Sequence, residues 1–162
     1  MKPKIVTIGV YGFDESSFFE ALREAEVDTF CDIRARRGLR GATYAFANSQ
    51  RLQERLAELG IRYIHRKDLA PTKAVRDRQA QTDKVSKTAK RKRTVLDETF
   101  IQAYHSECLA TFDPTSLLAD IQSDTQVVAL FCVEREPEAC HRSLVAEKLA
   151  HVLNLEVEDI LP

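Results

Sequence analysis

The sequence predicts an α/β fold: a three-layer sandwich with a mostly parallel central sheet of four or five strands and helices on both faces. Two observations predict it. Short β-branched segments alternate with segments of helical apolar spacing, which is the pattern of βαβ units. In addition, Gln126–Val133 is apolar on both faces, as strands in the middle of a parallel sheet are. The 162 residues suffice for one domain, and we expect residues 1–162 to form a single one.

The first half of the chain contains the signals of three strands and two helices. We expect strands at Ile5–Val10, Val27–Ile33 and Ile61–Ile64, and helices at Glu15–Ala25 and from Asn48 or Ser49 to Leu59. Asp14 precedes the first helix, where a carboxylate can accept from free backbone N–H groups. Gly60 follows the second helix, in a position where glycine often ends helices. Four arginines and two glycines favour a loop at Arg34–Gly41.

The second half continues the alternation. We expect a helix at Leu96–Phe112, a second helix that starts at Asp113-Pro114, a strand at Gln126–Val133, a long helix from Pro137 or Cys140 to Leu153, and an edge strand at Leu155–Ile160. Strands separated by helices imply right-handed crossovers, so the carboxyl ends of the strands meet at one edge of the sheet. Ligands of such sheets bind at that edge.

A basic segment interrupts this pattern. Residues 73–93 hold nine Lys or Arg and two Asp, although the whole chain has a net charge of -1. High charge and few large apolar side chains favour a solvated loop or a frayed surface helix. We interpret the segment as a flexible insertion or lid within the domain. It either serves solubility or meets phosphate-bearing partners, nucleic acid included.

Polar and ionisable residues follow each strong strand. Tyr11 and Gly12 follow the first strand, and Asp32 and Arg34 end the second. After the strand at Gln126–Val133 comes a run that includes Glu134, Cys140, His141 and Arg142. Because these segments share one predicted edge, we expect their side chains to form one pocket.

The residue types suggest roles in this pocket. The candidates for proton transfer or nucleophilic attack are Asp32, Glu134, His141 and Cys132. The candidates for holding an anion are Arg34, Arg142, Tyr11 and Gly12. The candidates for nucleic-acid contact are Arg36, Arg37, Arg91, Lys92 and Arg93. Structural roles stay open beside these: core packing for Cys132, a local ion pair for Asp32 and Arg34, and internal pairing for Arg142.

Several classes of protein are excluded or disfavoured. The chain lacks the glycine-rich fingerprints of dinucleotide-binding and P-loop proteins and the G-x-S-x-G elbow of α/β-hydrolases. Its longest apolar run, Val127–Val133, is far too short to span a membrane. No secretory signal is apparent and the four cysteines form no C-x-x-C pair, so we expect a cytoplasmic protein with reduced thiols.

The sequence also resembles a known family. Thr7-Ile8-Gly9, Asp32-x-Arg34 and the closing C-x-E-x-x-P-x-x-C-H-R-S over Cys132–Ser143 are similar to the bacterial and archaeal family catalogued as domain of unknown function 488. The resemblance runs from about Lys4 to Leu153. It implies a compact α/β fold and brings little biochemistry.

Three hypotheses about function follow. The first is an enzyme that binds an anionic ligand, such as a phosphate-bearing metabolite, a nucleotide or a nucleic-acid end, at the strand edge. The second is a non-catalytic nucleic-acid-binding or regulatory module that uses the basic segment. The third is a metal or redox-sensing protein built on Cys132, Cys140 and His141, which are three nearby soft ligands. The first hypothesis assigns no metal ligand, and the sequence identifies no cofactor.

Overall fold

The computed structural model describes residues 2–87 and 95–162 of the chain. The strands are β1 (Lys4–Ile8), β2 (Thr29–Asp32), β3 (Arg62–His65), β4 (Val127–Phe131) and β5 (Val157–Ile160). The helices are α1 (Glu15–Glu24), α2 (Ser49–Glu58), α3 (Lys73–Ser86), α4 (Glu98–Tyr104), α5 (Pro114–Asp120) and α6 (His141–Leu153). Short 3-10 helices lie at Ala45–Ala47, Lys67–Leu69 and Pro137–Ala139, and a π-helical turn at His105–Leu109 follows α4.

The strands form one sheet in the order β3-β2-β4-β1-β5, and every neighbouring pair is parallel. β4 is central, as its apolar sequence predicted, and β5 is an edge strand. The carboxyl ends are level, because Asp32 pairs in register with both His65 and Phe131, and Phe131 pairs with Ile8. The segments that leave β1, β2, β3 and β4 therefore start at a common edge.

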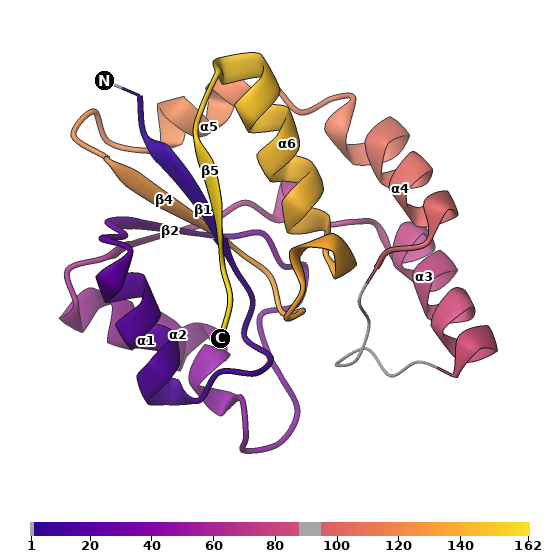
Figure 1. The fold of residues 1–162 in the computed structure, drawn as a ribbon, viewed down its shortest axis with the longest axis horizontal. Helices are drawn as coiled ribbons and strands as arrows, with labels where there is room; N and C mark the ends of the chain where they lie inside the picture. Colours follow the sequence, from indigo (N-terminus) through magenta and orange to yellow (C-terminus); the bar gives the residue numbers. More distant parts are fainter. Residues whose placement is uncertain (1, 88–94) are drawn as a thin grey trace.

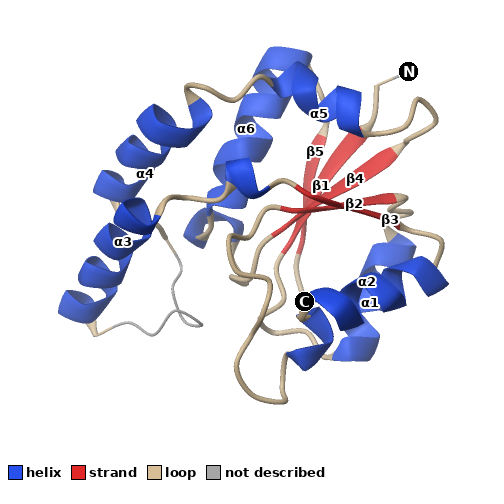
Figure 2. Ribbon diagram, turned by 180° about the vertical axis from the view of Figure 1, so that it is seen from behind, coloured by secondary structure: helices blue, strands red, loops and turns tan. Residues whose placement is uncertain are grey.

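Helices cover both faces of this sheet. α1 and α2 lie on one face, and α5 and α6 lie on the other (Figure 2). This arrangement confirms the predicted three-layer α/β sandwich. α3 and α4 pack against each other and stand beside the sandwich (Figure 1).

The core beneath α1 is aromatic. The buried ring of Phe18 lies within about 6.4 Å, centroid to centroid, of its nearest aromatic neighbours, which are Phe13, Phe19, Phe30, Phe46 and Phe131. Asp14 caps α1 as predicted: its side chain accepts from the Ser17 N–H, and Ser17 Oγ accepts from the Asp14 N–H. The cap and the aromatic packing fix α1 over the sheet.

The direction of the chain connections creates a crevice between β2 and β4. These two strands are neighbours, yet β2 continues to β3 on one side and β4 continues to β5 on the other. The connections pass over opposite faces, through α2 and α6 (Figure 2). Where connections diverge in this way, the segments at the carboxyl ends separate and leave room for a ligand.

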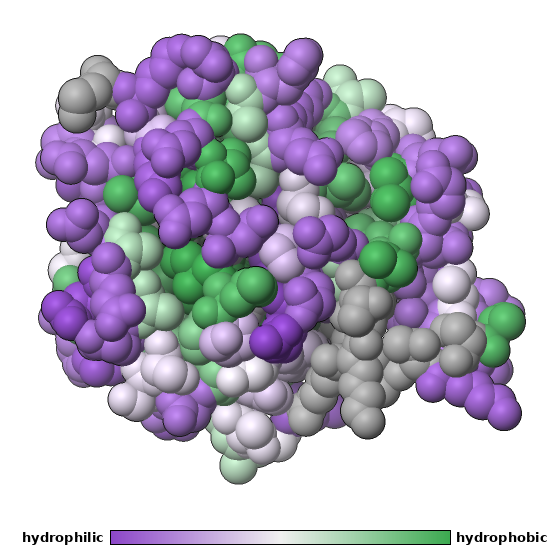
Figure 3. Space-filling model, in the orientation of Figure 1, coloured by the Kyte–Doolittle hydropathy of each residue, from purple (hydrophilic) through white to green (hydrophobic). Residues whose placement is uncertain are grey.

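Two predicted segments differ in detail from the structure. The helix expected at Leu96–Phe112 is divided into α4 and the π-helical turn. Of the two forms considered for the basic segment, Lys73–Ser86 adopts the helix, and its interpretation as a flexible lid stays a prediction. In the described part of the chain, none of the helices combines the length and apolar character needed to cross a membrane. Figure 3 shows one mostly hydrophilic face of the molecule with scattered apolar patches.

Candidate functional site

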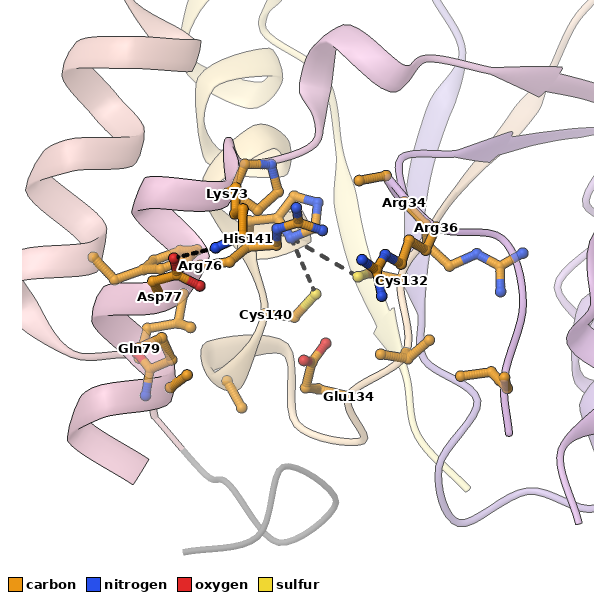
Figure 4. A pocket seen from close by; sticks show the side chains of 18 of the residues that line it. Arg34, Arg36, Lys73, Arg76, Asp77, Gln79, Cys132, Glu134, Cys140 and His141 are labelled. Atoms are coloured by element: carbon orange, nitrogen blue, oxygen red, sulfur yellow. Dashed lines mark hydrogen bonds and ion pairs between the residues drawn. The ribbon is translucent and has the colours of Figure 1, made fainter. Parts of the chain in front are cut away.

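A cavity of about 420 Å³ lies at the crevice between β2 and β4. Its walls come from three parts of the chain: the loop after β2, the segment between β4 and the start of α6, and the helix pair α3 and α4 (Figure 4). The polar and ionisable side chains on these walls are Arg34, Arg36, Lys73, Arg76, Asp77, Gln79, Glu134, Cys132, Cys140 and His141. Four of them are Lys or Arg and two are carboxylates, so the cavity favours an anionic ligand.

Arg34 is held rigidly at one wall. Its Nε donates to Asp32 Oδ1 at 2.9 Å and its Nη2 donates to Oδ2 at 2.8 Å, which is a two-bond ion pair with both side chains buried. The guanidinium lies over the ring of Phe131, 4.7 Å from its centroid. Its third nitrogen, Nη1, is buried and has no hydrogen-bond partner among the described residues. A buried charged donor of this kind is costly unless a ligand accepts its hydrogen bond.

Asp32 lies behind Arg34 and does not line the cavity. Besides Arg34, it accepts a hydrogen bond from Tyr63 Oη at 2.7 Å. Burial, together with the Asp32 carboxylate, raises the pKa of Tyr63 to about 12, so Tyr63 stays a phenol donor. The structural alternative considered for Asp32, a local ion pair, is what the contacts show, and Asp32 orients Arg34.

Two thiols and an imidazole gather at the end of β4. His141 Nδ1 is 3.8 Å from Cys132 Sγ and 3.7 Å from Cys140 Sγ, and all three residues are buried at the cavity wall (Figure 4). On its other side, His141 Nε2 is 3.1 Å from the carbonyl oxygen of Ile33. Burial, with Cys132 beside it, raises the pKa of Cys140 to about 11, so without a bound cation this sulfur is a protonated thiol.

Helix α3 supplies a wall that the sequence analysis did not assign to the pocket. Thr72 caps this helix by accepting from the Val75 N–H, and the first two turns carry Lys73, Arg76 and Asp77 along the cavity. Lys73 pairs with Asp77 at 2.9 Å. The excess of Lys and Arg in residues 73–93 was the available signal, but sequence spacing does not show which face of the helix meets the sheet.

Arg142 occupies a different place from the one predicted. It is fully buried and does not line the cavity. Its Nη1 donates to the Glu134 carbonyl at 2.6 Å, and its Nη2 donates to the Arg135 carbonyl at 3.1 Å. Both terminal nitrogens therefore hold the loop after β4, and these contacts give Arg142 a structural role rather than the predicted anion-binding one.

Tyr11 and Gly12 also lie outside the cavity. The Tyr11 ring packs against Tyr44, with centroids 5.1 Å apart, and the Gly12 N–H donates to the Tyr44 hydroxyl at 3.3 Å. Gly12 has a φ of 95°, which a non-glycine residue adopts only with strain. These contacts fit a tight turn after β1, and neither residue is placed to bind an anion in this cavity.

The candidates for nucleic-acid contact separate into three cases. Arg36 lines the cavity, whereas Arg37 does not and donates to the Tyr63 hydroxyl at 3.4 Å. Arg91, Lys92 and Arg93 lie outside the described residues. Among the described candidates for nucleic-acid contact, Arg36 therefore lines the cavity with Arg34, and Arg37 contacts Tyr63 instead.

The sequence also contains a cysteine–arginine spacing that the sequence analysis did not consider. Arg37 lies six positions after Cys31, as the arginine does in phosphatases with a Cys-loop-Arg signature. The structure does not support that chemistry, because Cys31 lies fully buried inside β2 and not at the start of a phosphate-binding loop. Burial raises the pKa of the Cys31 thiol far above neutral, which disfavours the nucleophilic thiolate.

Comparison with known proteins agrees with the family resemblance noted for the motif Cys132–Ser143. A family model described as "Domain of unknown function DUF488" matches residues 15–149. The chain belongs to this family. No curated protein and no solved structure matches the chain. For this DUF488 protein, the assignment of function therefore rests on the cavity itself.

Proposed function

We propose that this DUF488 protein is an enzyme that binds a phosphate-bearing small molecule in the cavity between β2 and β4. The observation that carries the proposal is the buried Nη1 of Arg34, a rigidly held charged donor at the cavity wall with no partner among the described residues. A phosphate or carboxylate oxygen would satisfy it. Phosphate suits the site better, because Arg36, Lys73 and Arg76 supply further positive charge for a multiply charged group.

The size and lining of the cavity favour a small molecule over a nucleic-acid strand. Its volume of about 420 Å³ falls in the usual range for small-molecule sites, roughly 300–1,000 Å³. The uncharged part of the ligand can contact apolar side chains on the walls. These are Leu39, Pro71, Leu96 and Phe100. A nucleotide or a phosphorylated metabolite combines both features.

Glu134 is the group we assign to proton transfer. It lines the cavity and is 4% exposed, and a buried carboxyl beside a bound phosphate is a suitable general acid or base. His141 is less suited to that role than the sequence suggested, because its two ring nitrogens face the Ile33 carbonyl and the two thiols. Cys132 lines the same wall, with its thiol beside the His141 ring.

Binding experiments with a matched pair of variants test the proposal. Calorimetric titration or ligand-induced thermal stabilisation would compare inorganic phosphate, a nucleoside monophosphate, a sugar phosphate and a short oligonucleotide. We expect Arg76→Ala to weaken binding of the best small phosphate about tenfold, because one charge-assisted hydrogen bond is lost. Arg78→Ala is the control: it removes the same charge from the same helix, but Arg78 is exposed and does not line the cavity.

Two results would contradict the proposal. One is that none of the small phosphates binds or stabilises the protein. The other is that Arg76→Ala and Arg78→Ala weaken binding equally, which would mean that the charge of the surface and not the cavity attracts the ligand. Strong binding of the oligonucleotide alone would favour a nucleic-acid-binding module in place of the enzyme.

A further inference from the structure

We propose that Cys132, Cys140 and His141 form a binding site for a thiophilic divalent cation of the Zn²⁺ type, with a fourth coordination position open to the cavity. This inference goes beyond the proposed function and does not depend on it. The three residues come from the end of β4 and the start of α6, which the fold brings together.

The distances between the three ligand atoms fit tetrahedral coordination. With Zn–S bonds of about 2.3 Å and Zn–N bonds of about 2.0–2.1 Å, tetrahedral angles place a sulfur and a nitrogen roughly 3.6 Å apart. The observed distances from His141 Nδ1 are 3.8 Å to Cys132 Sγ and 3.7 Å to Cys140 Sγ. All three ligand atoms lie within 4.8 Å of one another. A cation can therefore enter the site with little movement of the side chains.

The imidazole is oriented as a ligand. The Ile33 carbonyl oxygen, 3.1 Å from His141 Nε2, can only accept a hydrogen bond, so Nε2 carries the proton. In the neutral ring this leaves the lone pair on Nδ1, which faces both sulfurs. A backbone carbonyl that fixes the tautomer in this way is a recurring partner of metal-binding histidines.

Charge and access complete the argument. Two thiolates balance a divalent cation, so a buried complex with Cys132 and Cys140 carries no net charge. Three protein ligands with one open position distinguish catalytic zinc sites from structural ones, which are closed by four. All three ligands line the cavity, so a fourth ligand can reach the cation from it, and Glu134 lines the same cavity.

Cobalt spectroscopy on the full-length protein tests this site without any anionic ligand. We would reduce the thiols, remove bound metal with a chelator, and titrate with Co²⁺. The expected result is one Co²⁺ per chain, with the charge-transfer absorption of cobalt–thiolate bonds and the visible bands of tetrahedral cobalt, both removed when Zn²⁺ is added. We expect Cys132→Ser, Cys140→Ser and His141→Gln each to weaken binding about 100-fold or more.

Controls separate this site from alternatives. Cys108→Ser removes a buried cysteine outside the cluster and should leave binding unchanged. Arg76→Ala should also bind Co²⁺ normally, so a failure of the anion proposal is distinguishable from a failure of this one. The proposal is overturned if the reduced wild-type protein shows no cobalt–thiolate absorption, if Cys108→Ser loses it equally, or if His141→Gln binds as tightly as wild type. A Cys132–Cys140 disulfide that resists reduction would also overturn it.

Discussion

At the scale of single residues, the two buried arginines differ in what their terminal nitrogens contact. Arg34 donates to Asp32 through Nε and Nη2 and leaves Nη1 at the cavity, whereas both terminal nitrogens of Arg142 donate to backbone carbonyls and its Nε, away from the cavity lining, has no hydrogen-bond partner among the described residues. The sequence predicted that Asp32 and Arg34 emerge together, because residues two apart share a face of a strand. It also placed Arg142 in this pocket, which is wrong, since Arg142 does not line the cavity. A sequence motif shows neither the direction in which a side chain points nor the path of the loop next to it.

The role of Arg142 leads to a test of stability. Arg142→Met keeps much of the side-chain volume and removes the donors, so the carbonyls of Glu134 and Arg135 lose charged partners. We expect the free energy of unfolding to fall by about 3 kcal/mol, measured by urea denaturation. Arg135→Met is the control, since that side chain is 47% exposed, and it should change the stability by roughly 0.5 kcal/mol or less. Equal stability of both variants would show that Arg142 does not hold the loop.

At the scale of helices and strands, local signals predicted the elements well and their ends less well. Asp14 accepts from an N–H group of α1, and Pro114 lies in the first turn of α5, both as expected. Asn48 precedes α2 as expected, but its side chain makes no capping hydrogen bond there. The division of the segment Leu96–Phe112 was not predicted, because its apolar spacing continues through the π-helical turn. The contact of α3 with the cavity depends on its packing against α4, which no local pattern contains.

The cap of α3 offers a test at this scale. Thr72→Ala removes the side-chain acceptor of the Val75 N–H, and we expect a loss of about 1 kcal/mol in the stability of the helix. Faster amide hydrogen exchange confined to α3 would be the direct readout, and weaker phosphate binding would accompany it because Lys73 and Arg76 lose their support. Thr99→Ala in the first turn of α4, where Asp97 is the cap, should leave α3 unaffected. Unchanged exchange in the Thr72 variant would refute the proposed importance of this cap.

At the scale of the whole molecule, the strand order determines where the site can form. The sequence predicted a mostly parallel sheet with a central apolar strand, but it gave no strand order. The observed order is β3-β2-β4-β1-β5. Because β2 and β4 are neighbours with diverging connections, Arg34 and Cys132 lie beside one cavity although about a hundred positions separate them in sequence. Sequence patterns cannot supply this order, since each strand pairs with residues distant along the chain.

The close packing of β1 and β4 at this edge gives a further prediction. A methyl group on Gly9 would lie 1.8 Å from the Glu134 carbonyl oxygen, closer than any real contact. We expect Gly9→Ala to lower the free energy of unfolding by about 3 kcal/mol or more, because backbone must move on both sides. In the control Gly38→Ala the added methyl meets nothing within 4 Å, so its thermal unfolding should match wild type. A wild-type melting temperature for Gly9→Ala would contradict the close approach.

The strand order also has a consequence for protein synthesis. β1 is translated early, but both of its partners come late: Lys4 pairs with Val127, and Ile5 pairs with Val157. On the ribosome, β2 and β3 can pair with each other before β4 and β5 are made. Until then the apolar side chains of β1 stay exposed, and its backbone N–H and C=O groups lack their strand partners. Such a nascent strand invites association with other chains, so β1 is the segment that we expect a chaperone to shield until translation has passed β4.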